Sequence, residues 1–125
     1  MERSTLLEDF DETGQSTTTV EVYDPIADKW TEAAPLPQLT DHTATASYEG
    51  KLYVDGGGYL SADAFSDKLF IYDPTNDKWT EGPNLPTARG ALTANFINGI
   101  LYAVGGVDVS GTSNTILAYD PRTDT

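Results

Sequence analysis

The sequence predicts an all-β fold built from repeated four-stranded antiparallel sheets. A Tyr-Asp-Pro tripeptide is followed by a Trp in two copies, and the two Trp residues lie 49 positions apart. Pairs of adjacent glycines recur at the same period. A period near about fifty residues, filled with strand-forming residues and turn signals, is typical of an array whose units pack against their neighbours. The repeated positions are Tyr23 and Trp30, then Gly56, Gly57, Tyr72 and Trp79, then Gly105, Gly106 and Tyr119.

The N-terminal residues 1–18 lie outside this pattern. Thr5 and Glu8 have the spacing of a helix capping box, and Gly14 is suited to end a short helix. We therefore expect residues 1–18 to form a leader that is either a short helix or loosely ordered. An ordered leader would place apolar side chains over a bare sheet edge.

Strands are expected where apolar residues alternate between turn signals. Asn98-Gly99 separates two such segments and is favoured in two-residue primed turns, so a hairpin is predicted there. Glu49-Gly50 occupies the matching place in the preceding copy. Each Tyr strand ends at Asp-Pro, where Pro presets φ and the Asp side chain can bond the backbone ahead of it. The expected strands are residues 19–23, 30–32, 43–48, 51–54, 68–72, 79–81, 91–97, 100–104 and 115–119.

The order of a Gly pair, a Tyr and a Trp, repeated at one period over residues 19–125, resembles the kelch repeat. The resemblance implies kelch-type β-propeller blades of four antiparallel strands. It places a partial blade at 19–37, a complete blade at 38–86 and a partial blade at 87–125, so one chain holds an incomplete ring. The glycines would let the backbone leave the second strand, and the large aromatic residues would fill the wedge between blades, which is a structural role.

Charge and residue usage exclude several classes of partner. The 125 residues carry a formal net charge of −13, so phosphate backbones and anionic headgroups are repelled, and neither a nucleic acid nor a membrane is expected as a partner. No apolar run approaches the ~20 residues of a membrane span, and the N-terminus lacks the pattern of a signal peptide. These observations leave the cellular compartment open.

No catalytic or cofactor-binding motif stands out in the sequence. Cys is absent and His42 is the single His, and there is no phosphate-binding loop or nucleophile elbow. By resemblance, copper oxidases related to galactose oxidase would need a Tyr-Cys cross-link and histidine ligands. We therefore expect no catalytic residue, no cofactor and no metal site in this chain. The alternative is a fragment of a propeller enzyme acting on carbohydrate, with its catalytic residues on other blades.

Candidate binding residues fall in loops, because the strands are committed to packing. Two loop sets are expected on one rim, residues 58–67 with 107–114 and residues 38–41 with 87–90. Tyr59 and Phe65 are candidates for an exposed contact patch, and Asp108 is a further binding candidate.

Two charged residues allow two interpretations each. Arg89 is either a partner contact or a member of an internal salt bridge. Asp55 stands where the next copy has Val104, and it is either a loop cap or a carboxylate aimed at a ligand or cation.

Together these features predict a non-catalytic kelch propeller module for protein–protein or ligand binding. The expected partner is another protein or further copies of the chain. The nine expected strands exceed two four-stranded blades by one, so three chains would give six blades if one strand is displaced at each junction. Self-association through incomplete blades is therefore a hypothesis from the sequence.

Overall fold

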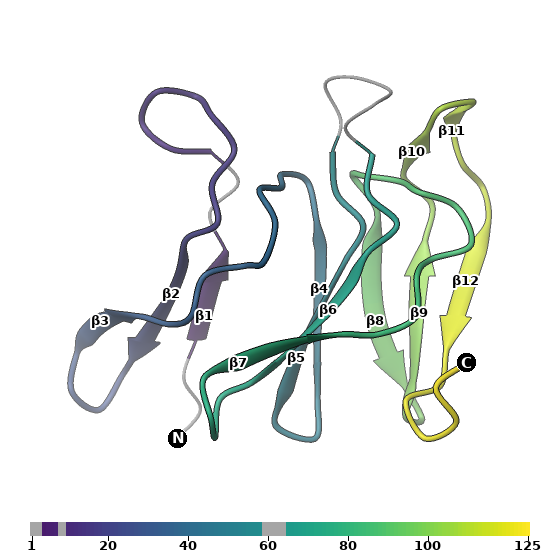
Figure 1. Ribbon diagram of the computed structural model, residues 1–125. Helices are drawn as coiled ribbons and strands as arrows, with labels where there is room; N and C mark the ends of the chain where they lie inside the picture. Colours follow the sequence, from purple (N-terminus) through teal and green to yellow (C-terminus); the bar gives the residue numbers. More distant parts are fainter. Residues whose placement is uncertain (1–3, 8–9, 59–64) are drawn as a thin grey trace. The chain divides into compact units, whose positions relative to one another are not determined.

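The computed structural model describes residues 4–7, 10–58 and 65–125 and is built of antiparallel β-strands (Figure 1). The chain forms two compact units, Met1–Asp41 and His42–Thr125. Within the described ranges, no helix is long and apolar enough to cross a membrane. The strands are β1 (Ser4–Leu7), β2 (Val20–Asp24), β3 (Lys29–Glu32), β4 (Ala44–Tyr48), β5 (Lys51–Asp55), β6 (Leu69–Asp73), β7 (Lys78–Glu81), β8 (Thr93–Ile97), β9 (Ile100–Val104), β10 (Val107–Asp108), β11 (Gly111–Thr112) and β12 (Ile116–Tyr119).

The four-stranded sheet predicted for the middle of the chain is confirmed. β4, β5, β6 and β7 pair in sequence order, each antiparallel to the next. Glu49 and Gly50 join β4 to β5 with φ of 48° and 76°, and Asn98 and Gly99 join β8 to β9 with φ of 52° and 79°. Positive φ at both central positions is the geometry of a primed two-residue turn, so both predicted hairpins are confirmed.

The second unit has a hydrophobic core between two sheets, β4 to β7 and β12-β9-β8, which lie side by side in Figure 1. Phe96 of β8 stacks on Tyr48 at 4.7 Å between ring centroids and meets the edge of Tyr53 at 4.9 Å. Burying side chains of this size contributes about 1.5–3 kcal/mol each, so each sheet stabilises the other. The buried members of the cluster are Ala44, Tyr53, Leu69, Ala94 and Leu101.

The leader expected as a helix or loosely ordered segment contains a strand instead. β1 pairs antiparallel with β2, and Ser4 lies opposite Tyr23 just as Leu52 of β5 lies opposite Tyr72. By this register β1 takes the place of β5 in the first blade. The capping-box spacing that starts at Thr5 is overridden because the edge of β2 offers a ladder of backbone hydrogen bonds to an added strand.

The strand count of the chain changes accordingly. The described residues contribute three, four and three strands to the three blade-type sheets, ten in place of the nine expected. The arithmetic that completed six blades from three chains rested on nine strands and is wrong. The expected strand from residue 91 also begins later, at Thr93, because Ala91 has a φ of 52° and its N–H donates to the His42 carbonyl.

The repeated Tyr-Asp-Pro segment closes equivalent turns. Tyr72 Oη donates to Asp77 Oδ1 at 2.7 Å, and the Tyr72 ring lies tilted against Trp79 at 5.0 Å. Asp73 Oδ1 accepts from the N–H of Thr75 at 2.9 Å, as predicted for an Asp before a turn. Burial and the Asp77 carboxylate raise the pKa of Tyr72 to about 12, so the phenol stays a donor. The same Tyr-to-Asp bond joins Tyr23 to Asp28 and Tyr119 to Asp124.

Candidate functional site

Loops at one end of the second unit are joined by main-chain hydrogen bonds. The N–H of Gly57 donates to the Arg89 carbonyl at 2.8 Å, Arg89 N–H to the Ser66 carbonyl at 3.1 Å, and Ser66 N–H back to the Gly57 carbonyl at 3.0 Å. Gly90 and Val107 exchange two further bonds of 3.0 and 2.8 Å. We call residues 56–58, 66, 89–90 and 105–107 the glycine rim. Parts of three predicted loops, 58–67, 87–90 and 107–114, therefore meet in it.

Close backbone approach explains the glycine content of the rim. A Cβ on Gly90 would lie 1.5 Å from the Gly58 carbonyl oxygen, and a Cβ on Gly106 would lie 2.6 Å from the Gly90 carbonyl oxygen. Both contacts are with backbone, so no side chain can rotate away to relieve them. The third glycine of the 56–58 run, which departs from the repeat, is thus part of this packing.

Arg89 lies inside the rim and is only 1% exposed. Its Nη1 donates to the Gly105 carbonyl at 3.0 Å and to Ser113 Oγ at 3.2 Å. The guanidinium therefore ties residues 87–90 to the segment that follows β9. This burial does not fit an exposed contact with a partner. It fits an internal role, but the acceptors are a neutral carbonyl and a hydroxyl in place of the carboxylate of the expected salt bridge.

The other loop candidates occupy different positions. β10 and β11 form a hairpin that projects from the end of β9 in Figure 1, and we call residues 107–114 the outer loop. Asp108 is half-buried and its Oδ1 accepts from the N–H of Ser110 at 2.7 Å, while Val109 between them is 71% exposed. Phe65 is half-buried, and Tyr59 lies outside the described residues.

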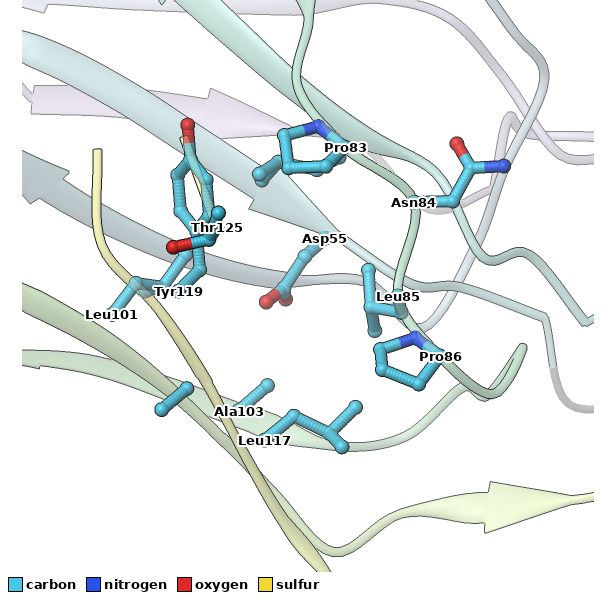
Figure 2. A pocket seen from close by; sticks show the side chains of 12 residues that line it. Asp55, Pro83, Asn84, Leu85, Pro86, Leu101, Ala103, Leu117, Tyr119 and Thr125 are labelled. Atoms are coloured by element: carbon cyan, nitrogen blue, oxygen red, sulfur yellow. The ribbon is translucent and has the colours of Figure 1, made fainter. Parts of the chain in front are cut away.

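Asp55 ends β5 and reaches into a cavity of 140 Å³ between the two sheets of the second unit. Its side chain is buried, with 2% of the residue exposed. Figure 2 shows the carboxylate pointing into the space bordered by Leu85, Ala103 and Leu117. Among the described residues, none offers a hydrogen bond to Asp55 Oδ1. We call this space the Asp55 cavity, and its larger apolar lining residues are Leu69, Pro83, Leu85, Pro86, Leu101 and Leu117.

The surroundings of Asp55 shift its ionisation. Burial raises the pKa of Asp55 from 3.8 to about 7, because an apolar environment disfavours the charged form. The positive charge of Arg89 opposes this shift with a smaller effect. Near neutral pH the folded chain therefore holds both forms of the carboxyl. An oxygen aimed into a cavity matches the interpretation of a carboxylate directed at a ligand or cation, which stays a prediction.

The two places offer main-chain hydrogen-bonding groups and a buried carboxyl. Within the part of the chain that the structure describes, no three His, Cys, Asp or Glu side chains gather as a metal site would need. The glycine rim supplies a hydrogen-bonded platform with an exposed loop, and the Asp55 cavity supplies one buried carboxyl among apolar walls.

Sequence reasoning missed two features of these places. The first is the Asp that accepts a hydrogen bond from each repeated Tyr. It stands five residues after the Tyr in all three copies, so this constant spacing indicates the bond from the sequence alone. The Asp55 cavity had no such signal, because its walls come from β6, β9, β12 and the segment after β7, which only the fold brings together.

Comparison with known proteins gives consistent matches. The Kelch motif family matches residues 9–37, 41–86 and 88–125, and its first match starts inside the predicted leader. Kelch-like protein 35 of Homo sapiens is 53% identical over 38 residues, which cover 30% of this chain and 6% of that protein. Kelch-like protein 36 of Rattus norvegicus and of Mus musculus are each 38% identical over 47 residues, 38% of this chain and 8% of each protein. The chain thus matches only a small part of the length of these relatives.

A solved structure described as "Structure of YjhT" has the same fold. It superposes with a TM-score of 0.73 at 21% sequence identity, covering 86% of this chain and 43% of that chain. The architecture is therefore an incomplete β-propeller of antiparallel blades, as the sequence predicted.

Proposed function

Since this chain belongs to the Kelch motif family, we propose that it is a non-catalytic propeller module that binds a protein or ligand through the glycine rim and its outer loop. The strands are occupied by packing between sheets, which leaves the loops to carry recognition. The observation that supports this proposal most directly is an exposed loop held on a fixed platform.

The platform lowers the entropy lost on binding. Main-chain hydrogen bonds and the buried Arg89 guanidinium hold the rim before any partner arrives, so fewer torsions are ordered at the interface. Val109 offers an exposed apolar contact, and Asp108 adds a carboxylate beside it. The net charge of −13 favours partners with basic groups near the contact.

Paired variants test the proposal. Val109→Ser removes the apolar tip of the outer loop, and Ile97→Ser is its control, because Ile97 is 58% exposed and borders the β8–β9 turn at the other end of the strand from Thr93. Proteins co-purifying with each variant from cells of the source organism are quantified by mass spectrometry. We expect the Val109 variant to lose a defined set at least about tenfold, as loss of a central contact does, while the control retains it. If the Val109 and Ile97 variants co-purify with the same proteins in the same amounts, the proposal is contradicted.

The remaining sequence candidates enter the same assay. Phe65→Ala and Tyr59→Ala test the neighbouring loop, and Asp108→Asn tests the carboxylate of the outer loop. Loss of the same proteins as with the Val109 variant assigns these residues to one surface. If these variants retain all of those proteins, the contact is limited to Val109 at the tip of the outer loop.

Self-association is the second part of the proposal, and open strand edges favour it. In the described ranges, β12 pairs with β9 on one side only, and β1 pairs with β2 on one side only. Ile116 on β12 is 63% exposed. Because such edges accept strands from other chains, light scattering of the purified chain should show multimers that dissociate on dilution. A compact, well-folded monomer at every concentration would remove this part.

No observation on the described residues favours the alternative, a propeller enzyme acting on carbohydrate. Turnover of any member of a glycan panel by the 125-residue chain would overturn the non-catalytic proposal.

A further inference from the structure

Asp55 stands where the repeat places an apolar side chain. Asp55 is the last residue of β5, and Val104, 49 positions later, is the last residue of β9. A buried carboxyl with an unpartnered oxygen is among the least favourable groups to place between packed sheets. The repeat does not account for this residue, because its counterpart Val104 is apolar and 38% exposed, whereas Asp55 is a buried carboxyl.

The size of the Asp55 cavity indicates a ligand larger than water. An apolar cavity of about 150 Å³ accepts a benzene-sized molecule, and this one measures 140 Å³. A water molecule would need two or more polar partners, while the walls are mainly Leu, Pro and Ala side chains. A ligand that fits must therefore present an apolar body to the walls.

The carboxyl selects the polar end of that ligand. An ammonium group needs only one carboxylate oxygen for a charge-assisted hydrogen bond, and Oδ1 of Asp55 is buried without a partner among the described residues. A planar guanidinium would use two oxygens for its fork geometry, and a divalent cation would need several oxygen ligands. The described residues supply no such cluster.

The segment between β7 and β8 gives a route to the carboxyl. Pro83, Asn84 and Pro86 line the cavity and are exposed to solvent, so its mouth lies beside them. The net charge of −13 draws cations toward this surface. We propose that the Asp55 cavity is a binding site for a small alkyl- or arylammonium group, either a free amine or the side chain of a lysine. This site is separate from the outer loop, so it does not rest on the proposed function.

Binding by this mechanism depends on pH. The charged group that acts on the carboxyl is the Arg89 guanidinium. Tyr119 lines the cavity, and burial raises the pKa of its phenol, so it stays neutral and donates to Asp124. The amine is protonated across the neutral range, so ionisation of Asp55 controls uptake. Affinity should rise with pH through about 7, where the pKa of Asp55 lies.

Titration with benzylammonium, followed by NMR shifts of the amides lining the cavity, tests the site. Benzyl alcohol is the neutral probe of the same shape. We expect the alcohol to bind at least about tenfold more weakly, because it forms no charge-assisted bond. Asp55→Asn should lose the preference for the amine. Glu49→Gln is the control and should retain this preference, because it also removes one carboxylate but at an exposed position in the β4–β5 turn.

A second variant tests the cavity without changing Asp55, so that a folding defect of Asp55→Asn cannot be mistaken for loss of binding. Ala103→Val narrows the cavity without changing any charge, and it should weaken benzylammonium while circular dichroism stays unchanged. Equal affinity of amine and alcohol, equal affinity of wild type and Asp55→Asn, or no saturable shift at the solubility limit overturns the proposal. Nα-acetyl-lysine methylamide separates the two sources: binding as tight as benzylammonium indicates a lysine side chain, and much weaker binding indicates a free amine.

Discussion

Replacing Asp55 with Asn should stabilise the chain at neutral and alkaline pH and leave its stability almost unchanged in acid. The folded chain holds this carboxyl in an apolar cavity, where burial raises its pKa to about 7 from an ordinary value of 3.8. Unfolding returns the group to water and to its ordinary value. Asn has a similar shape and does not ionise.

The sign and size follow from proton linkage. Between pH 3.8 and about 7 the folded state binds the proton more tightly than the unfolded state, so the contribution of Asp55 to stability falls as pH rises through this window. Below it both states are protonated and the contribution does not change. A shift from 3.8 to about 7 is about 3 pKa units, and at about 1.36 kcal/mol per unit the ionised carboxyl destabilises the folded chain by about 4 kcal/mol above pH 7.

Urea unfolding of wild type and Asp55→Asn at several pH values between about 4 and 8 measures this difference, with Trp fluorescence and circular dichroism as probes. Other titrating groups are shared by both chains, so they cancel when the two free energies of unfolding are subtracted. Glu49→Gln is the matched control, since it removes an exposed carboxylate from the same sheet. The Asn difference should grow toward about 4 kcal/mol, while the control difference stays flat.

A difference for Asp55→Asn that stays constant across the whole pH range would refute the reasoning. It would mean that the pKa of Asp55 is the same in the folded and the unfolded chain, because hydration or the charge of Arg89 offsets the effect of burial. The same result would weaken the ammonium site, because a carboxylate that is already stabilised in the folded chain needs no ligand to satisfy it.

Three further substitutions test the packing that positions the two sites. Gly90→Ala should destabilise by at least about 3 kcal/mol because its Cβ meets backbone, whereas Gly50→Ala, with open space around it and a φ of 76°, should cost about 1–2 kcal/mol; equal urea midpoints would contradict the close approach. Ala91→Gly should stabilise by about 0.5–1 kcal/mol because Ala91 is exposed at a φ of 52°, and a lower thermal midpoint would speak against this. Asp77→Ala should cost about 2 kcal/mol, because it removes the acceptor of Tyr72 and places Ala at a φ of 53°, while Asp77→Asn retains Oδ1, tolerates this φ and should cost little; similar losses in both would show that neither the bond nor the backbone conformation at this position stabilises the turn.

Features set by neighbours in sequence were predictable. Asn98-Gly99 specifies its turn through the positive φ of two adjacent residues, and Asp73 bonds a backbone N–H two residues ahead. The period then repeats these local devices, so the strands and their order followed from the sequence. Apart from the later start of β8 at Thr93, the predicted strands agree with the observed ones to within one residue at each end, because turns of this kind bound them.

Features that depend on distant residues were not predictable in the same way. β1 owes its conformation to the edge of β2, and nothing within its own four residues outweighs the capping-box pattern. The burial of Arg89 depends on acceptors at Gly105 and Ser113, and the surroundings of Asp55 depend on leucines of β6, β9 and β12. Sequence reasoning marked both charged residues as candidates, but their contacts were needed to separate their roles.

The contrast between these two residues distinguishes structure from function in this chain. Arg89 and Asp55 are both charged and both at most 2% exposed. The guanidinium is matched by a carbonyl and a hydroxyl, so packing of the rim is enough to explain it. The carboxyl has an oxygen without a partner, and of the buried side-chain polar atoms that the structure describes it is the one left unsatisfied. The next repeat has Val104 at this position, and the unpaired carboxylate is therefore the observation on which the proposed ammonium site rests.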